Sequence, residues 1–135
     1  MVLDSNILVS AFLSPGGEGA YVLDAAQEHS MILSPFILAE VSRVLIYDRI
    51  RRKYDFTTED VGKFLEALYS VSLVVEPEIK ITVCSDPDDN NVLACAVAAD
   101  APYLITRNTK HFPAAYQDTR VITPGEFLDM IRERE

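Results

Sequence analysis

The sequence begins with MVLDSNIL (residues 1–8), in which three apolar residues run directly into an aspartate. A short apolar run of this kind is typical of a buried strand that ends at the edge of a sheet. Two later segments, MILSP (31–35) and YLITRN (103–108), also pass from apolar to polar residues. Segments with helical spacing of apolar residues separate these runs. The pattern predicts alternating strands and helices, and therefore a mostly parallel sheet.

Working outward from residues 1–8 gives the remaining elements. We expect strands at 1–3, 31–33, 71–75, 103–106 and 120–122. We expect helices at 7–13, from 17 to about 28, from 35 to about 49, and after 57, 86 and 123, with a basic elbow at Arg49–Lys53. Ser34-Pro35, Asp86-Pro87 and the capping box Thr123–Glu126 mark three helix starts. Right-handed crossovers would place helices on both faces. The expected fold is therefore α/β, a three-layer α/β/α domain over residues 1–135.

The helices also carry stripes that predict which side chains face the core. The inward positions are expected to be Ile37, Val41, Val44 and Leu45, then Val61, Phe64, Leu65 and Leu68, then Val92, Leu93, Ala96 and Val97, and finally Phe127, Leu128 and Ile131.

Composition limits the class of protein. The 135 residues are 49% hydrophobic and 24% charged, which suits one globular domain, and the net charge is −9. That charge argues against a protein that coats nucleic acid, but not against an enzyme whose bound cations offset it.

Cys84 and Cys95 lack zinc-site spacing and are expected to be reduced, buried thiols. Ile7–Leu13 is too short to span a bilayer, so we expect a cytoplasmic protein without signal peptide or membrane segment.

Polar side chains follow the expected strands at the edge where parallel sheets place their sites. Asp4 and Asn6 follow the first strand, and Glu40 lies two turns into the helix after the second. Asp86, Asp88 and Asp89 begin a later helix, and Thr106, Arg107 and Asn108 follow the next strand.

Each of these residues also has a purely structural interpretation. Asp86 can cap its helix, and Asp88 can interact favourably with the helix dipole. Glu40 lies at the border of an apolar stripe, where solvated glutamates are common. Asp89 is harder to explain in this way, because it shares a stripe with Val92 and Leu93. A carboxylate that heads a buried stripe needs a partner.

Taken together, three carboxylates from distant segments are expected to meet at one sheet edge without a neutralising lysine. Two like charges about 4 Å apart repel by about 4 kcal/mol at an effective dielectric constant near 20. A divalent cation would remove this repulsion, and oxygen ligands favour Mg²⁺ or Mn²⁺. Such a site is suited to activating water and cleaving a phosphodiester.

With these residues in view, the sequence resembles the PIN-domain family, which includes the VapC-type toxins of toxin–antitoxin pairs. The resemblance covers nearly the whole chain and is carried by Leu3–Leu8, Ser34-Pro35 with Glu40, Asp86–Asn90 and Leu104–Asn108. It implies a Mg²⁺- or Mn²⁺-dependent endoribonuclease with acidic positions at Asp4, Glu40 and Asp89. It also implies hydrogen-bonding support from Asn6 and Thr106, and Asp86 as an added metal ligand.

The chain departs from the family pattern at Asn108, where many members carry a fourth aspartate. An amide can bind a metal through its oxygen but brings no charge. RNA phosphates could be held by Arg43, Arg107 and Lys110, with His111 nearby, and by Arg49–Lys53, which could equally be a solvated helix end. The resemblance further implies an antitoxin partner and a homodimer, for which the segment Tyr21–Leu23 is one candidate surface.

Three alternatives are weighed against the nuclease. A phosphatase of the haloacid dehalogenase type needs a second aspartate where this chain has Asn6, and a lysine near the phosphoryl group; neither is evident in the sequence. A phosphorelay receiver needs a lysine after a late strand, and Thr123-Pro124 at that place argues against it. A catalytically inactive PIN-like module that binds RNA or protein is kept open by Asn108.

Overall fold

The computed structural model describes residues 1–134 and contains one six-stranded sheet in the order β3-β2-β1-β4-β6-β5. In chain order the strands are β1 (Val2–Leu3), β2 (Ile32–Leu33), β3 (Leu73–Val74), β4 (Tyr103–Ile105), β5 (Ala115–Tyr116) and β6 (Thr119–Ile122). All neighbouring strands are parallel except β5, which runs antiparallel to β6. The predicted mostly parallel sheet is confirmed.

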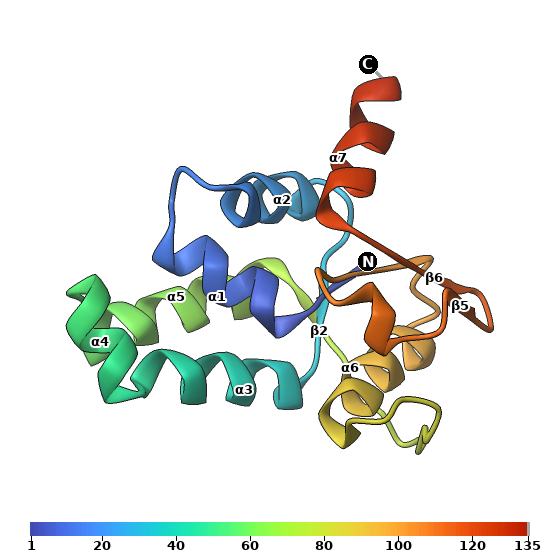
Figure 1. The fold of residues 1–135 in the computed structure, drawn as a ribbon, viewed down its shortest axis with the longest axis horizontal. Helices are drawn as coiled ribbons and strands as arrows, with labels where there is room; N and C mark the ends of the chain where they lie inside the picture. Colours follow the sequence, from blue (N-terminus) through green and yellow to red (C-terminus); the bar gives the residue numbers. More distant parts are fainter. Residues whose placement is uncertain (135) are drawn as a thin grey trace.

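Helices cover both faces of this sheet. They are α1 (Ser5–Leu13), α2 (Glu18–Gln27), α3 (Pro35–Ile46), α4 (Asp48–Tyr54), α5 (Thr58–Val71), α6 (Pro87–Ala98) and α7 (Pro124–Glu133), with a short 3₁₀ helix η1 (Thr109–His111). From β1 the chain adds β2 and then β3 on one side of β1, and it then crosses back to place β4 on the other side of β1. Right-handed connections therefore place α1 to α5 on one face and α6 on the other (Figure 1). The result is the expected three-layer α/β/α arrangement.

The central strands form the core because they are covered on both faces. Val2, Leu3, Leu33, Leu104 and Ile105 are all fully buried. Such strands need no alternation of polar and apolar residues, which explains the continuous apolar runs in the sequence.

Local sequence signals set the helix starts where they were predicted. The Ser34 hydroxyl accepts from the main chain of Ile37, and the Asp86 carboxylate accepts from Asp88. The Thr123–Glu126 capping box is formed in both directions. These contacts satisfy main-chain N–H groups that a helix leaves free at its first turn.

Several expectations were wrong in detail. Arg49–Lys53 is part of helix α4, not an elbow, and α3 ends at Ile46. Val44, expected to face the core, is 36% exposed because it faces a cavity, and Val71, expected to begin the third strand, is the last residue of α5. The two-residue strand β5 was not predicted, since a run so short carries no periodicity.

The remaining expectations concern the two cysteines, the candidate dimer segment and membrane-spanning helices. Cys84 and Cys95 are buried and free, as expected. In the candidate dimer segment only Tyr21 is exposed, because Val22 and Leu23 belong to the core. No helix within residues 1–134 is both long and apolar enough to cross a membrane.

Candidate active site

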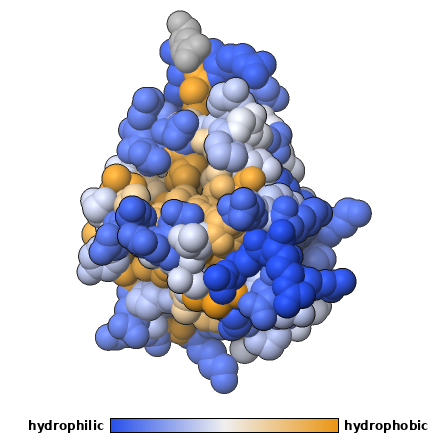
Figure 2. Space-filling view, turned by 90° about the vertical axis from the view of Figure 1, so that its left-hand side faces the viewer, coloured by the Kyte–Doolittle hydropathy of each residue, from blue (hydrophilic) through white to orange (hydrophobic). Residues whose placement is uncertain are grey.

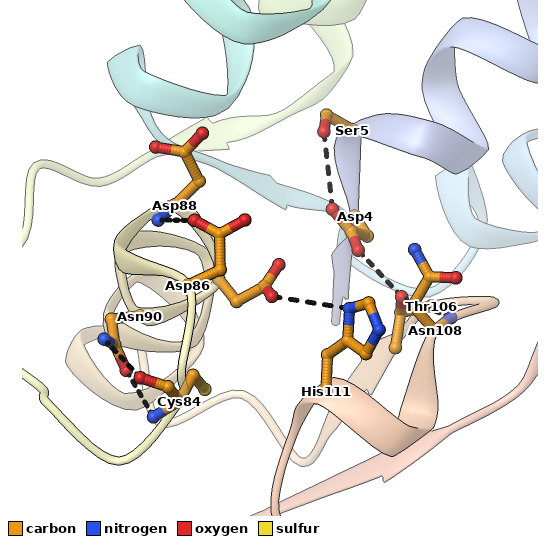
Figure 3. Close-up of polar contacts among 10 residues, drawn as sticks. Asp4, Ser5, Cys84, Asp86, Asp88, Asn90, Thr106, Asn108 and His111 are labelled. Carbon is orange, nitrogen blue, oxygen red and sulfur yellow. Dashed lines mark hydrogen bonds and ion pairs between the residues drawn. The ribbon is translucent and has the colours of Figure 1, made fainter.

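Asp4 lies at the end of β1, where strand pairing places it beside Thr106. Leu3 is paired with Ile105 across β1 and β4, so the residues that follow both strands are neighbours. The Thr106 hydroxyl donates to Asp4 Oδ2 at 2.7 Å, and the Ser5 hydroxyl contacts Oδ1 at 3.4 Å (Figure 3). Asp4 is only 5% exposed. The sheet thus holds a buried carboxylate in a fixed position at its edge.

Burial raises the pKa of Asp4, and the hydrogen bonds from Thr106 and Ser5 oppose this effect. No lysine, arginine or histidine in the described part of the chain forms an ion pair with Asp4. Its negative charge is therefore stabilised only by neutral donors.

Glu40 lies on α3 and reaches the same edge. The Ser5 hydroxyl donates to its Oε1, and Arg43 Nη2 lies 3.7 Å from Oε2. Burial raises the pKa of Glu40, the Ser5 hydrogen bond lowers it, and the charges of Asp4 and Asp88 raise it further. Although Glu40 is at the border of the α3 stripe, its side chain is only 14% exposed.

Asp89 is in the first turn of α6 and is close enough to Asp4 to feel its charge. Its pKa is raised to about 6 by burial first and then by the charges of Asp4 and Asp86. His111 Nδ1 lies 3.7 Å from Asp89 Oδ2 and lowers the pKa of Asp89. Ser5 contacts both Asp4 and Glu40, and the charges of these two residues act on Asp89, so the predicted carboxylates after β1, on α3 and on α6 are neighbours.

Asp86 has a structural contact as well as a place near the site. Its carboxylate caps α6 by accepting from the main chain of Asp88 at 2.9 Å. The Asn90 side chain bonds both the N–H and the C=O of Cys84, which fixes the loop before α6 (Figure 3). These contacts hold the first turn of α6, and with it Asp89, against the sheet edge.

Asn108 follows β4 and is tied to the cluster through Thr106. Its main-chain N–H donates to Thr106 Oγ1 at 3.1 Å, and that oxygen in turn donates to Asp4. Asn108 is exposed, beside Thr106 and Asp4 (Figure 3). The side chain of Asn6 makes no hydrogen bond to any described residue, and its Oδ1 is buried.

The candidate RNA-binding cations occupy three different places. Arg43 adjoins Glu40, whereas Lys110 lines a cavity of about 540 Å³ together with Asp86, Asp89 and His111. Arg107 instead forms an ion pair of 3.7 Å with Glu18. The structure therefore brings Arg43 and Lys110 to the acidic edge and leaves Arg107 outside it.

Ser5 was not singled out from the sequence, although it contacts both Asp4 and Glu40. The only available signal was its place between two predicted site residues. His111 was considered but not selected, and it is beside Asp89 even though its side chain is 61% exposed.

The donors present are compatible with a hydrated divalent cation. Within residues 1–134, no three His, Cys, Asp or Glu side chains are grouped closely enough to enclose one ion. Mg²⁺, however, usually keeps several waters and is held by one or two carboxylates together with substrate phosphates. Asp4 and Asp89 offer hard oxygen donors, and the charge of Asp4 makes ionisation of Asp89 more costly. A cation between them would relieve that cost.

We expect Thr106→Val to lower the free energy of unfolding at pH 7 by about 1.5–3 kcal/mol, because a buried carboxylate loses a hydrogen bond. Thr119→Val is a matched control, since the buried Thr119 hydroxyl donates to the neutral Ala101 carbonyl at 2.7 Å. The control should cost about 0.5–1.5 kcal/mol. Urea unfolding at pH 4 and pH 7 measures both. Equal losses at both pH values would contradict a charge-dependent contact at Thr106.

The stability of the metal-free protein should decrease as the pH rises from about 4 to about 6. The folded protein binds the Asp89 proton more tightly than the unfolded chain does, with a pKa of about 6 against 3.8. Stability is therefore highest below the lower value and is lost as the pH passes the upper one. Two pKa units correspond to roughly 3 kcal/mol, and partial exposure reduces this to about 1–2 kcal/mol.

Urea unfolding in EDTA between pH 4 and pH 7, on wild type and Asp89→Asn, isolates this contribution. The variant should lose less stability over this range. Mg²⁺ should raise the melting temperature of the wild type more than that of the variant. Parallel pH profiles would show that Asp89 is not the group responsible.

The fold and the acidic edge define an α/β protein with the features of a hydrolase that acts on nucleic acid. Residues 1–110 match the model of the family described as the PIN domain, so the chain belongs to this family. Proteins of this family are generally nucleases.

Two further comparisons found similar proteins. An uncharacterized protein of Methanocaldococcus jannaschii is 29% identical over 139 residues, with 96% of this chain and 89% of that protein covered. A crystal structure of VapBC2 from Rickettsia felis, bound to a DNA fragment from its promoter, matches with a TM-score of 0.62 and 17% identity. That match covers 90% of this chain and 96% of the other. At this identity the structural match establishes the fold.

Proposed function

We propose that the protein is a Mg²⁺- or Mn²⁺-dependent endoribonuclease that cleaves single-stranded RNA. The observation that carries this proposal is the convergence of Asp4, Glu40 and Asp89: the Ser5 hydroxyl contacts both Asp4 and Glu40, and the charges of Asp4 and Glu40 raise the pKa of Asp89. A purely structural explanation of these residues would leave the buried Asp4 carboxylate without an ion-pair partner among the described residues, although Glu40 and Asp89 lie close to it. The PIN-domain family supports the class of reaction, and the family resemblance supports RNA as the substrate.

The residues divide into distinct roles. Asp4 and Asp89 would hold the cation, with Asp86 and Asn108 as additional oxygen ligands. The cation would supply positive charge that activates water and stabilises the charge developing on the phosphate. Glu40 would accept a proton from the attacking water, a role that suits a carboxylate with a raised pKa.

The remaining residues position these groups. Ser5 donates to Glu40 and Thr106 donates to Asp4, so both carboxylates are held by hydroxyl groups. Arg43 and Lys110, on opposite sides of the acidic edge, would bind phosphates of the RNA on either side of the cleaved bond.

The direct test is cleavage of a mixed-sequence single-stranded RNA by the purified protein in Mg²⁺, in Mn²⁺ and in EDTA. We expect cleavage that requires the metal, and little or none of the equivalent DNA. Asp24→Asn, which changes an exposed carboxylate on α2, is the control and should retain full activity. Equal cleavage with and without EDTA would contradict the proposal.

A second candidate is a catalytically inactive PIN-like module that binds RNA or protein. Asn108 favours it, because the site lacks one carboxylate that many family members carry. Folded protein that binds RNA in EDTA but never cleaves it would support this alternative.

We further propose that the protein is the toxin of a toxin–antitoxin pair and acts as a homodimer in the cytoplasm. The family resemblance and the similarity of fold to VapBC2 of Rickettsia felis support this. Sedimentation of the protein alone, and expression with the product of a neighbouring gene, test the two parts separately. A monomer, or growth unaffected by expression, would oppose the respective part.

A further inference from the structure

A cavity of about 400 Å³ lies beside the acidic edge, between α1, α3 and the end of α4. Its walls include Val9, Leu13 and Val44, and Tyr54 lines it from α4. Ser5 and Glu40, which bond to each other, form part of its lining. The cavity is therefore continuous with the proposed site of cleavage, and its size falls within the range of small-ligand pockets.

Two polar side chains of this cavity are available to a ligand: the Asn6 amide, which is unpaired, and Arg43, which is largely exposed. The Asn6 amide makes no hydrogen bond to residues 1–134, and its Oδ1 is buried. An unpaired buried polar atom of this kind is costly unless a ligand or a small rearrangement pairs it. Arg43 lines the cavity as well, and its side chain is 67% exposed.

Helix α4 concentrates positive charge at this end of the molecule. It carries Arg49, Arg51, Arg52 and Lys53 against one aspartate, Asp48, in a chain with a net charge of −9. Lys53 Nζ lies 5.4 Å from the centre of the Tyr54 ring. Figure 2 faces this end and shows apolar surface in the middle of the view with strongly hydrophilic side chains beside it.

We propose that this cavity receives one unstacked base of the RNA, from the nucleotide next to the bond that is cleaved. The inference rests on the proposed function. Bases of single-stranded RNA are commonly held by stacking on aromatic rings and by hydrogen bonds along their edges. Tyr54 supplies the ring, the Asn6 amide supplies a donor and an acceptor, and Arg43, which also lines the cavity, supplies a positive charge for the phosphate.

A base fits this set of groups better than an apolar peptide side chain does. An apolar occupant would fill the walls but leave the Asn6 amide without a partner. A base has an apolar face, and its edge carries both donors and acceptors. Arg43 in the cavity wall matches the phosphate that accompanies a base, and it would not assist an uncharged ligand.

The first test does not depend on cleavage. The four nucleoside 5′-monophosphates are titrated into the isotope-labelled protein in EDTA, and chemical shifts are followed by NMR. We expect at least one of them to shift the signals of Asn6, Val9 and Tyr54. The absence of shifts at these residues with all four nucleotides overturns the inference, including the case in which the cavity accepts only an apolar peptide.

The second test uses cleavage of RNA that is intact or lacks the base at one position beside the cleaved bond. Tyr54→Leu should raise KM for the intact RNA roughly 5- to 100-fold, since stacking on an aromatic ring contributes to binding. With abasic RNA, wild type and variant should become equal, because neither can stack the missing base. Tyr69→Leu is the control, since Tyr69 is 63% exposed on α5 and does not line the cavity.

The two tests separate this inference from the proposed function. Metal-dependent cleavage in which Tyr54→Leu has the same effect on intact and abasic RNA would keep the nuclease and reject the base cavity. Nucleotide-induced shifts at Asn6 and Tyr54 in a protein that cleaves no RNA would keep the base cavity and reject the nuclease.

Discussion

Replacement of Asp89 by asparagine is expected to reduce the rate of metal-dependent RNA cleavage by roughly 10²- to 10³-fold. The change keeps the size of the side chain and removes the charge that would hold a cation opposite Asp4. Charge stabilisation by a bound metal contributes several kcal/mol to such reactions, and each 1.36 kcal/mol corresponds to a factor of ten. Single-turnover cleavage of a labelled RNA at saturating Mg²⁺ measures the effect.

The fold should survive this substitution, because Asp89 stabilises α6 only through its favourable position in the first turn. The metal-free variant should in fact be somewhat more stable at pH 7, since one member of the repelling cluster is neutral. Asp4→Asn should be similarly inactive, whereas the surface control Asp24→Asn should retain activity. Undiminished cleavage in both Asp4→Asn and Asp89→Asn would reject the site assignment.

Asn108→Asp is expected to increase the affinity for Mg²⁺ and the cleavage rate at limiting Mg²⁺ by about tenfold. The substitution places a charge beside Thr106 and Asp4, where the amide now offers only a neutral oxygen. Two unit charges about 4 Å apart interact by about 4 kcal/mol at an effective dielectric constant near 20. Because Asn108 is exposed, solvent should reduce this to about 1–2 kcal/mol.

Calorimetric titration with Mg²⁺ and cleavage at several Mg²⁺ concentrations test this expectation. Without metal, the same variant should be less stable than the wild type, because a further negative charge joins the cluster. Asn91→Asp, an exposed position on α6, controls for the general effect of one added charge. Equal Mg²⁺ affinity in wild type and Asn108→Asp would place Asn108 outside the metal site.

The central strands and the helix starts could be predicted from the sequence, whereas the contacts between distant segments around the site could not. The strands β1, β2 and β4 could be predicted because buried parallel strands appear as continuous apolar runs followed by polar residues. Helix starts at Ser34, Asp86 and Thr123 could be predicted because capping depends on residues only a few positions apart. Asp4 and Thr106 followed from the rule that parallel strands end at the same edge.

Contacts between distant segments could not be read in this way. The hydrogen bond of Ser5 to Glu40, the contact of His111 with Asp89 and the ion pair of Arg107 with Glu18 join residues far apart in the chain. Their formation depends on how α2, α3 and η1 pack, and periodicity within one element carries no information about this packing.

The sequence by itself therefore determined the class of fold and predicted which acidic residues lie at the sheet edge, because strand burial and helix capping are local properties. Only the tertiary structure decided that Val44 and Tyr54 line one cavity with Asn6 and Glu40. It also decided that the pKa of Asp89 rises to about 6, since burial and the charges of Asp4 and Asp86 act only once the chain is folded. Desolvation and charge repulsion depend on distances in space, which the linear order of residues does not contain.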